Sequence, residues 1–592
     1  MTQTALLDQL LAAGLVDINL HRLTRHLAFL YQVDDDWSLS ALACTLALAE
    51  QGSVCCDLAD TVSLDQLCVH PLPIDWPAAD QWLNQLSASG LVSPAGQASK
   101  ALVVDSGLVY LQRYWRDQQI IVDALLNQVD PPPDAVTAIA NQVLDGQPPA
   151  AHRPSTTGAL GSSPWQHPHI EVIAGGPGTG KTTLIGQLIA EKLTSANPPQ
   201  AIALTAPTGR AAAHLQQAVT NHLAHHWPGQ AKSLEKRLWV GTVHRLLGWN
   251  RQGRVSHHRG QPILADLVVV DEASMLSLPF LARLIDALQP GASLILVGDP
   301  DQLTAIDAGA VLADLVAVPE VVAVRQLTTV HRYRGEIAEL AQAVHDGDAD
   351  RALSILNRGG DSIEWLDLDP SDPLAIPEPA ITGLKTDMLA QAERMRLAGL
   401  DDQPNLALSA LDEHRLLLAN RHGQAGLQRW TSLIQSWIDS TWRQLGQGAR
   451  WPIGLPVLIT RNDEQLGLFN GDSGVIIKHL GRPHLAVLEA SSPRLINPDL
   501  ISAWEPLFAS TVHKSQGSQY RSTTLVLPES AGQLASRQLI YTAITRAEDH
   551  LRLIGSAQAI RQAINTPVLR ASGLTAKLQG SRVSPSGNPL LG

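Results

Sequence analysis

Two patterns of apolar residues divide this chain into regions. Over residues 1–125, apolar side chains recur every three or four positions, as in LLDQLLAAGL and SALACTLALAEQ. That spacing places them on one face of a helix and predicts a helical N-terminal domain. This region contains no catalytic pattern, so we interpret it as a scaffold or partner-binding domain.

From about residue 169 the texture changes to short apolar runs that alternate with helical stretches. IEVIAG precedes TLIGQLIAEKL, AIALTAP precedes GRAAAHLQQAV, and LVVVDEAS precedes LPFLARLIDAL. Apolar runs of this kind between helices predict a parallel sheet that is buried on both faces. We therefore expect a first α/β core over residues 169–333. The Pro-, Gly-, Ser- and His-rich segment 126–168 before it is typical of a linker.

A second α/β core is expected over residues 334–570, because RLLLANRHG, STTLVLPES and HLRLIGSA are further strand-like runs. Inside it, residues 451–505 contain short strands with Gly, Pro and Asn-Gly turns, which predict a small β-barrel insert. Residues 571–592 include GSRVSPSGNPLLG and predict a flexible tail. The expected fold class is therefore α/β, with two cores behind a helical N-terminal domain.

Composition limits the function classes. The formal net charge is −13, so any contact with nucleic acid must be confined to a local groove. The spacing of the four cysteines does not match a zinc site, and reduced thiols of a cytoplasmic protein are the expected interpretation: Cys44, Cys55, Cys56 and Cys68. No apolar run reaches the roughly 18 residues of a membrane-spanning helix.

The strongest chemical signal is a glycine-rich loop between a predicted strand and a predicted helix. It fits the pattern G-x-x-x-x-G-K-[ST], in which backbone N–H groups surround phosphates and a helix N-terminus adds a favourable dipole. Lys181 is expected to reach the β- and γ-phosphates of ATP, and Thr182 to bind Mg²⁺. The expected nucleotide-binding residues are Gly175, Gly176, Pro177, Gly178, Thr179, Gly180, Lys181, Thr182 and Thr183.

Two later strands end in polar residues that suit ATP hydrolysis. LVVVDE ends in Asp271, a second candidate Mg²⁺ ligand, and Glu272, a candidate general base for the attacking water. SLILVGDPDQ follows, and Gln302 at its end is placed to sense the γ-phosphate. The sequence therefore predicts a P-loop ATPase.

The order of further motifs extends this prediction. APTGRAA, TVHRLLG, DEASM, GDPDQL, LTTVHRY, LGLFNGD, TVHKSQG and YTAITRA resemble the motifs of superfamily 1 helicases, in the branch that moves 5′→3′. The set most resembles the RecD family, the alpha subunits of exodeoxyribonuclease V, over about residues 170–560. This resemblance implies two RecA-like cores and an SH3-like β insert. Arg332 and Arg546, in the second region, would then reach the γ-phosphate across a cleft and act as arginine fingers.

The resemblance also implies contacts with DNA on the opposite rim of the cores. Hydroxyl, amide and cationic side chains suit phosphate contacts, and few aromatic residues lie among them, so low sequence preference is expected. Residues 249–263 are either a strand-separating pin or an ordinary solvated hairpin. The candidate DNA-binding residues are Thr208, Arg210, Thr242, His244, Asn470, Thr511, His513, Lys514 and Ser515.

The chain departs from the helicase pattern at one place. Such helicases carry a Gln-led helix before the P-loop strand that recognises adenine, whereas this chain has HRPSTTGALGSSPWQHPH, with Gln166 only nine residues before Gly175. No nuclease signature stands out either. The resemblance implies beta and gamma partner subunits, which would carry any nuclease site, and action at double-strand DNA ends, with residues 1–125 as the docking surface.

The primary hypothesis is an ATP-dependent 5′→3′ DNA helicase subunit of the RecBCD helicase–nuclease, acting in recombinational repair. A stand-alone helicase of the same branch, a DNA-transfer helicase and a regulatory subunit that binds ATP without translocating remain as alternatives.

Overall fold

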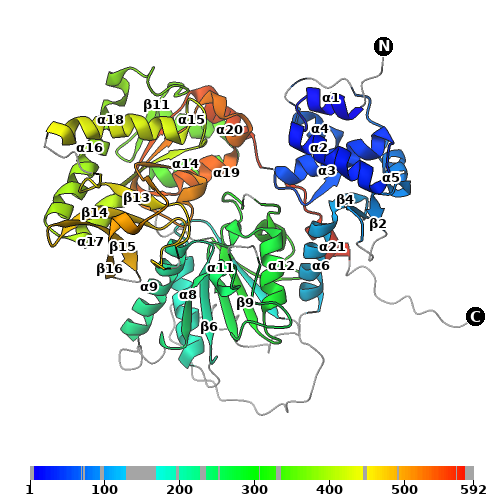
Figure 1. Cartoon of the computed structure of the whole chain (residues 1–592), viewed down its shortest axis with the longest axis horizontal. Coiled ribbons are helices and arrows are strands. Elements are labelled where there is room, and N and C mark those ends of the chain that lie inside the picture. The colour runs from blue at the N-terminus through cyan, green and yellow to red at the C-terminus, as the bar shows by residue number, and fades with distance from the viewer. Residues whose placement is uncertain are drawn as a thin grey trace, which may run out of the picture.

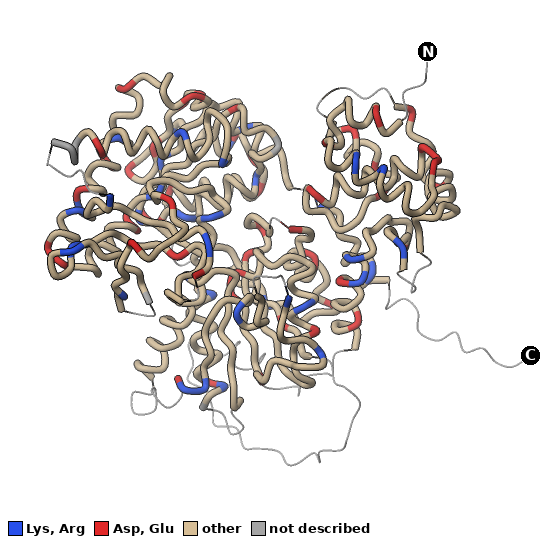
Figure 2. Tube along the Cα trace, viewed as in Figure 1, with Lys and Arg blue, Asp and Glu red and all other residues tan. Residues whose placement is uncertain are grey.

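The computed structural model of the chain describes residues 6–68, 70, 74–93, 99–127, 168–194, 199–226, 235–250, 254–305, 307–328, 335–444, 450–463, 465–489, 492–568 and 570–580. Three bodies make up the molecule (Figure 1). In this view the first core lies at the bottom, the N-terminal region at the upper right and the second core at the upper left. Acidic and basic residues are interspersed over all three bodies (Figure 2).

The N-terminal region combines helices with a small sheet. The carboxylates of Asp17 and Asp35 accept backbone N–H groups at the first turns of α2 and α3, which fixes where these helices begin. The helices are α1 (Leu6–Ala12), α2 (Ile18–Tyr31), α3 (Asp36–Glu50), α4 (Thr61–Gln66), α5 (Ala79–Ala88) and α6 (Gln112–Leu126). The sheet has the order β1-β4-β3-β2 and consists of β1 (Cys55–Asp57), β2 (Val92–Ser93), β3 (Leu102–Asp105) and β4 (Leu108–Leu111).

The prediction of a helical domain over residues 1–125 therefore missed this sheet. Its strands are two to four residues long, which is too short for the alternation of apolar and polar residues to be recognised. The four cysteines are free thiols, and burial raises the pKa of Cys44 and Cys56. Among the described residues, no group of three or more His, Cys, Asp and Glu side chains could hold a metal ion.

The first core is a parallel six-stranded sheet of order β10-β5-β9-β8-β6-β7. Its strands are β5 (His169–Gly175), β6 (Ile202–Ala206), β7 (Leu238–Thr242), β8 (Leu267–Val270), β9 (Ser293–Gly298) and β10 (Ala323–Leu327). One face packs with α8 (Lys181–Thr194) and α9 (Gly209–His226). The other face packs with α12 (Leu278–Ala287) and α13 (Val311–Val316). The short helices are α11 (Val243–Leu246) and η1 (Ala273–Met275).

The second core is a parallel five-stranded sheet of order β11-β20-β19-β12-β18. Its strands are β11 (Ile363–Leu366), β12 (His414–Leu418), β18 (Ala509–Thr511), β19 (Tyr520–Val526) and β20 (Ala547–Ile554). Its helices are α14 (Glu336–His345), α15 (Ala349–Arg358), α16 (Glu378–Leu400), α17 (Pro404–Leu411), α18 (Leu427–Gln444), η3 (His513–Ser515), η4 (Glu529–Leu534), α19 (Arg537–Ile544) and α20 (Ala557–Asn565). The α/β class with parallel sheets is thus confirmed.

An antiparallel sheet is inserted between β12 and β18. Its order is β16-β15-β14-β13-β17, and it packs against α16 and α17. Its elements are β13 (Pro456–Ile459), β14 (Ser473–His479), β15 (Arg482–Glu489), β16 (Ser492–Ile496), η2 (Pro498–Leu500) and β17 (Trp504–Pro506). This location agrees with the β-rich segment expected over residues 451–505.

The end of the described chain returns to the N-terminal region. The carbonyl of Ala571 accepts the N–H of Val54 at 2.7 Å, and that of Ser572 accepts Gln118 Nε2 at 2.6 Å. Helix α21 (Leu574–Gly580) then buries Leu574 and Leu578 in the apolar cluster shared by the N-terminal region and the first core. The predicted flexible tail over 571–592 is therefore wrong for residues 571–580, and the remainder lies outside the described residues.

Within the described part of the chain, no helix has both the length and the apolar character required to cross a bilayer.

Truncating the apolar anchor of α21 should destabilise the fold. Leu578 is fully buried, so Leu578→Ala leaves a cavity and should lower the free energy of unfolding by about 2–5 kcal/mol. Urea unfolding followed by tryptophan fluorescence measures this loss. The ring of Trp115 on α6 lies 5.6 Å from the Nζ of Lys577, which is the neighbour of Leu578 on α21. Leu534→Ala is the control, since Leu534 is 55% exposed. Equal urea midpoints for the two variants would contradict the structure.

The free energy of unfolding should decrease as the pH is lowered, because β12 contains a buried histidine. Burial lowers the pKa of His414 to about 3, and its Nε2 lies 2.9 Å from Thr524 Oγ1. Between pH 6.5 and 3 the unfolded chain binds a proton that the folded chain does not, so stability is complete above 6.5 and is lost as the pH falls. From pH 7 to 5 the parent should lose about 2 kcal/mol more than His414→Gln. The exposed His422→Gln should behave as the parent does in urea unfolding at both pH values.

Candidate active site

The glycine-rich loop connects β5 to α8. Gly178 and Gly180 have φ values of 75° and 82°, a left-handed conformation that favours glycine. A Cβ at Gly175 would lie 2.7 Å from Thr179 Oγ1, so the loop is closed too tightly there for a side chain. Lys181 begins α8, and its Nζ donates to the carbonyls of Gly175 and Gly176 at 2.6 and 2.9 Å. The ammonium group thus lies over the loop that would hold phosphates.

Two carboxylates follow β8 beside this loop. Asp271 is buried; burial first, and then the charge of Glu272, raise its pKa to about 7. The Glu272 N–H donates to Asp271 Oδ1 at 2.8 Å. Glu272 has a φ of 53°, which is uncommon for a residue with a side chain. Such backbone strain is concentrated at functional sites, where the surrounding structure holds it in place.

A buried hydrogen-bond network joins the two cores behind these carboxylates. Gln302 Nε2 donates to Asp299 Oδ2 at 2.9 Å within the first core. Arg546 Nη2, from the second core, donates to Gln302 Oε1 at 2.7 Å. All three side chains are at most 2% exposed. The position of the arginine is therefore set jointly by both cores.

The network and the loop line one cavity of about 360 Å³. It brings together residues that are up to 369 positions apart in the sequence. Its lining comprises Pro177, Gly178, Gly180, Lys181, Thr182, Thr183, Asp271, Glu272, Gln302, Gln519 and Arg546. Sequence analysis missed Gln519, although it lies just beyond the TVHKSQG motif. Arg332 and Gln166, which the sequence analysis also considered, lie outside the described residues.

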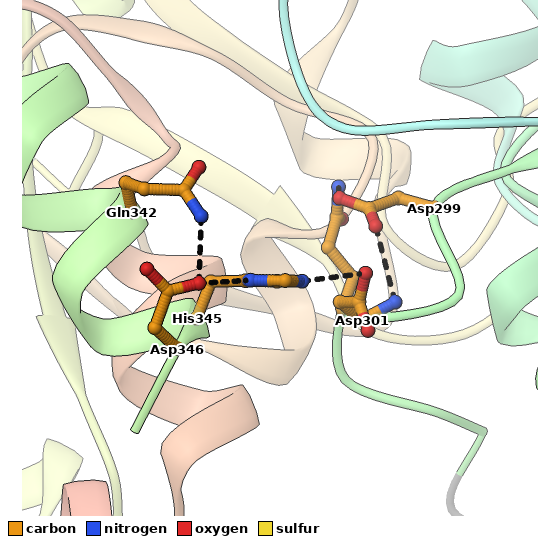
Figure 3. Close-up of polar contacts among 6 residues, drawn as sticks. Asp299, Asp301, Gln342, His345 and Asp346 are labelled. Carbon is orange, nitrogen blue, oxygen red and sulfur yellow. Dashed lines mark hydrogen bonds and ion pairs between the residues drawn. The ribbon is translucent and has the colours of Figure 1, made fainter. Parts of the chain in front are cut away.

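Further contacts cross between the cores at the mouth of the cleft. The Leu303 N–H donates to Thr542 Oγ1 at 2.9 Å. The ring of His345, at the end of α14, lies between Asp346 Oδ1 at 3.1 Å and Asp301 Oδ2 at 3.2 Å (Figure 3). Burial alone would lower the pKa of His345, but these two carboxylates outweigh it and raise the pKa above its usual value. The second core is thus attached to the same loop that carries Gln302.

A groove of about 230 Å³ lies on another side of the cleft, between the first core and the β insert. Arg210 Nη2 lies 2.6 Å from Asp412 Oδ2 across it, and the guanidinium of Arg245 lies 5.1 Å from the ring centroid of Phe469. Arg494 also lines the groove. Arg245, Phe469 and Arg494 were not predicted, although two of them lie inside the motifs TVHRLLG and LGLFNGD.

The predicted DNA-contact residues are placed unequally. Arg210 and Thr242 line the groove, His244 is exposed, and so is Asn470. Thr208 Oγ1 instead accepts the N–H of Ala211 at 3.2 Å.

The last four candidates belong to one short segment, in which most side chains have partners within the chain. Thr511 and Ser515 are buried; Ser515 Oγ donates to the Val512 carbonyl at 2.7 Å, and Thr511 Oγ1 accepts the Lys514 N–H at 3.4 Å. Lys514 Nζ lies 2.8 Å from Glu505 Oε1. His513 is half-buried in the same short helix η3. The geometry therefore gives Thr511 and Ser515 a structural role.

Comparison with known proteins agrees with this geometry. A model described as "AAA domain" matches residues 164–365, and one described as "UvrD-like helicase C-terminal domain" matches residues 506–554. The RecBCD enzyme subunit RecD of Mycolicibacterium smegmatis is 37% identical over 92% of this chain and 94% of that protein. The subunit of the same name from Haemophilus influenzae is 28% identical over 87% of each chain.

Two other proteins are similar over part of this chain. The ATP-dependent RecD2 DNA helicase of Deinococcus radiodurans is 30% identical over 68% of this chain and 50% of that protein. Among solved structures, Bacteroides Pif1 bound to ssDNA is 14% identical over 70% of this chain and 93% of that one, with a TM-score of 0.37.

The predicted family is thereby confirmed. A nearly full-length relative at this identity, together with a P-loop, paired carboxylates and a cross-core arginine in one cavity, shows that this chain belongs to the RecD family of ATP-dependent DNA helicase subunits.

Proposed function

We propose that this chain is an ATP-dependent 5′→3′ DNA helicase subunit of a RecBCD-type helicase–nuclease that acts at double-strand DNA ends in recombinational repair. The observation that carries the proposal is the hydrogen bond of Arg546, from the second core, to Gln302 beside the P-loop of the first. An ATPase whose site is completed by a second body can couple hydrolysis to the movement of that body.

Each residue around the cavity has a separate proposed role in ATP hydrolysis. The loop N–H groups and Lys181 hold the phosphates, and Arg546 stabilises the charge that develops on the transferred phosphoryl group. Glu272 orients the attacking water and accepts its proton. The Thr182 hydroxyl and the Asp271 carboxylate are hard oxygen donors that suit Mg²⁺, which would neutralise phosphate charge when bound. Arg332 is proposed as a second finger.

The groove is proposed as the path of single-stranded DNA. Arg210, Arg245 and Arg494 offer guanidinium groups for backbone phosphates, and Phe469 offers a ring for base stacking. Contacts of these kinds do not distinguish bases, so low sequence preference is expected. Because the groove is bounded by the first core and by the insert of the second, relative movement of the cores would change its length.

We propose the N-terminal region as the surface for the beta and gamma partner subunits. Helix α2 presents exposed apolar side chains there: Phe29 is 79% exposed and Leu30 57%. Neighbouring exposed apolar side chains on one helix are typical of a surface that binds another protein. The nuclease site would then lie on a partner. The proposed domains are 1–125, 169–333 and 334–570, with the insert folded as an SH3-like barrel.

A stand-alone helicase remains the second candidate. The RecD2 DNA helicase of Deinococcus radiodurans matches 68% of this chain, but that match covers only half of the relative. The RecBCD enzyme subunit RecD of Mycolicibacterium smegmatis is instead matched over 94% of its length, which favours the subunit proposal. A purely regulatory ATP-binding role is disfavoured by the presence of Lys181, Asp271, Glu272, Gln302 and Arg546 around one cavity.

Replacing the P-loop lysine tests the proposal directly. ATP hydrolysis by the purified chain should rise when single-stranded DNA is added, and Lys181→Gln should reduce it at least about 100-fold with and without DNA. Lys192→Gln, on the same helix but outside the cavity, is the matched control. Parent activity that DNA leaves unchanged would favour the regulatory alternative instead.

Replacing the cross-core arginine should slow the chemical step and leave nucleotide binding largely intact. Lysine cannot reproduce the fork of Arg546, so Arg546→Lys should lower kcat on the order of 10³-fold with little change in KM for ATP. Arg537→Lys, at the start of the helix α19 that precedes Arg546, is the control, because the Arg537 Nε donates to the Ile564 carbonyl away from the cavity. Steady-state kinetics decides the matter. A change in KM alone would contradict the role of Arg546 in the transition state.

A further inference from the structure

A second basic pocket lies where the N-terminal region meets the first core. Arg113 and Arg116 on α6 face Arg283 on α12 around a cavity of about 330 Å³. The two helices lie side by side at the right of the first core (Figure 1), and both carry basic positions there (Figure 2). All three arginines are exposed, so their guanidinium groups are accessible from solvent.

Two carboxylates share the pocket without cancelling its charge. Burial raises the pKa of Asp117 to about 6 although Arg283 and Arg113 act against this shift. Asp307 accepts the N–H of Ala308 at 2.9 Å and the hydroxyl of Ser277 at 3.4 Å, so it is bound to the first core. Three permanently charged guanidinium groups therefore face two carboxylates. The excess positive charge suits an anion, and guanidinium forks match the geometry of phosphate.

Aromatic side chains connect this pocket to the proposed DNA groove. Thr242, in the groove lining, caps α11, which carries His244. The His244 ring lies 4.5 Å from that of Phe280 and 5.5 Å from that of Trp249.

The second half of this connection runs along α12. The rings of Trp249 and Phe280 are stacked with centroids 5.3 Å apart. The guanidinium of Arg283 lies 4.8 Å from the Trp249 ring centroid. Cationic and aromatic groups thus lie between the groove and the pocket.

We propose that this pocket, named here the α6–α12 phosphate site, binds a backbone phosphate of single-stranded DNA that continues out of the groove past Trp249. The proposal rests on the proposed helicase function. Alternating guanidinium groups and aromatic faces are the chemistry that binds a single strand without base preference. The arginines alone would suit any small anion. The aromatic side chains His244, Phe280 and Trp249 between the groove and the arginines favour a polynucleotide instead.

The direction of the strand follows from the proposed direction of movement. Trp249 begins the segment 249–263, the candidate strand-separating pin; in its described part His258 pairs with Gln261, and the Ile263 N–H donates to the Ala287 carbonyl on α12. A motor that moves 5′→3′ has its leading side toward the 3′ end of the bound strand. With this candidate pin on the leading side, the α6–α12 phosphate site holds nucleotides on the 3′ side of those in the groove.

Salt-dependent DNA binding tests the site. Fluorescence anisotropy would compare a stretch of roughly 8 thymidylates alone with the same stretch extended by roughly 8 abasic nucleotides at either the 3′ or the 5′ end, so that the two extended strands are different molecules. For the parent chain, only the 3′ extension should raise affinity and steepen the dependence on salt. In the double variant Arg113→Gln/Arg116→Gln, that gain should disappear, on the order of tenfold in Kd. The slope of log K against log salt should fall by about 0.7 for each phosphate that the variant no longer neutralises.

Matched variants separate charge from folding. Arg116→Lys should retain most of the salt slope, because the slope depends on charge. Arg561→Gln on α20, an exposed arginine paired with Asp350, should match the parent. The DNA-independent ATPase of every variant should equal that of the parent, because these residues lie outside the catalytic cavity.

Several outcomes would overturn the site. Equal losses for short and extended oligonucleotides, an unchanged salt slope, or a gain from the 5′ extension alone would each do so. DNA binding like that of the parent, with loss of a protein partner, would assign the pocket to that partner. If the parent itself neither binds DNA nor is stimulated by it, the helicase proposal fails as well. If the parent responds to DNA and the double variant keeps its slope, the α6–α12 phosphate site fails alone.

Discussion

The hydrogen bond from Arg546 to Gln302 is the contact on which the catalytic arrangement depends. A buried guanidinium must have its N–H groups accepted, because an unpaired buried charge is strongly destabilising. Two acceptors of Arg546 come from its own core, the carbonyls of Thr542 and Ser518 at 3.2 and 3.0 Å. The third is Gln302 of the other core. Separation of the cores would leave that N–H to water, so closure of the cleft and completion of the site are one event.

The loop that carries Gln302 also makes other contacts with the second core. Asp299 accepts Gln302 Nε2 and the N–H of Asp301, while Asp301 meets His345 of α14. Leu303 is bound by Thr542 on α19. A shift of the second core would therefore move one short loop through several contacts, and Gln302 of that loop lines the P-loop cavity. This arrangement connects the loop beside the P-loop cavity to α14 and α19 of the second core.

Features encoded in contiguous residues could be predicted, and features made by distant ones could not. The P-loop, Asp271 and Glu272 follow buried strands, so their position at one sheet edge follows from the order of strands and motifs. The small sheet of the N-terminal region was not predicted, because a strand such as β2, with two residues, is too short to show a recognisable pattern. The seven-residue α21 was not predicted because the segment that leads into it is held by distant residues: Gln118, which bonds the Ser572 carbonyl, lies 454 positions before Ser572. The Arg245–Phe469 contact is likewise formed only when the cores meet. The tail prediction failed because a polar, Gly-rich end can still anchor itself by two leucines.

A double-mutant cycle on the cross-core hydrogen bond tests the central claim most directly. ATP hydrolysis at saturating ATP and single-stranded DNA would be measured for the parent, Gln302→Ala, Arg546→Ala and the double variant. If the two side chains act as one unit across the cleft, the double variant is about as slow as Arg546→Ala alone. If the two losses multiply instead, the residues act independently, and the claim that cleft closure completes the site through this contact is contradicted.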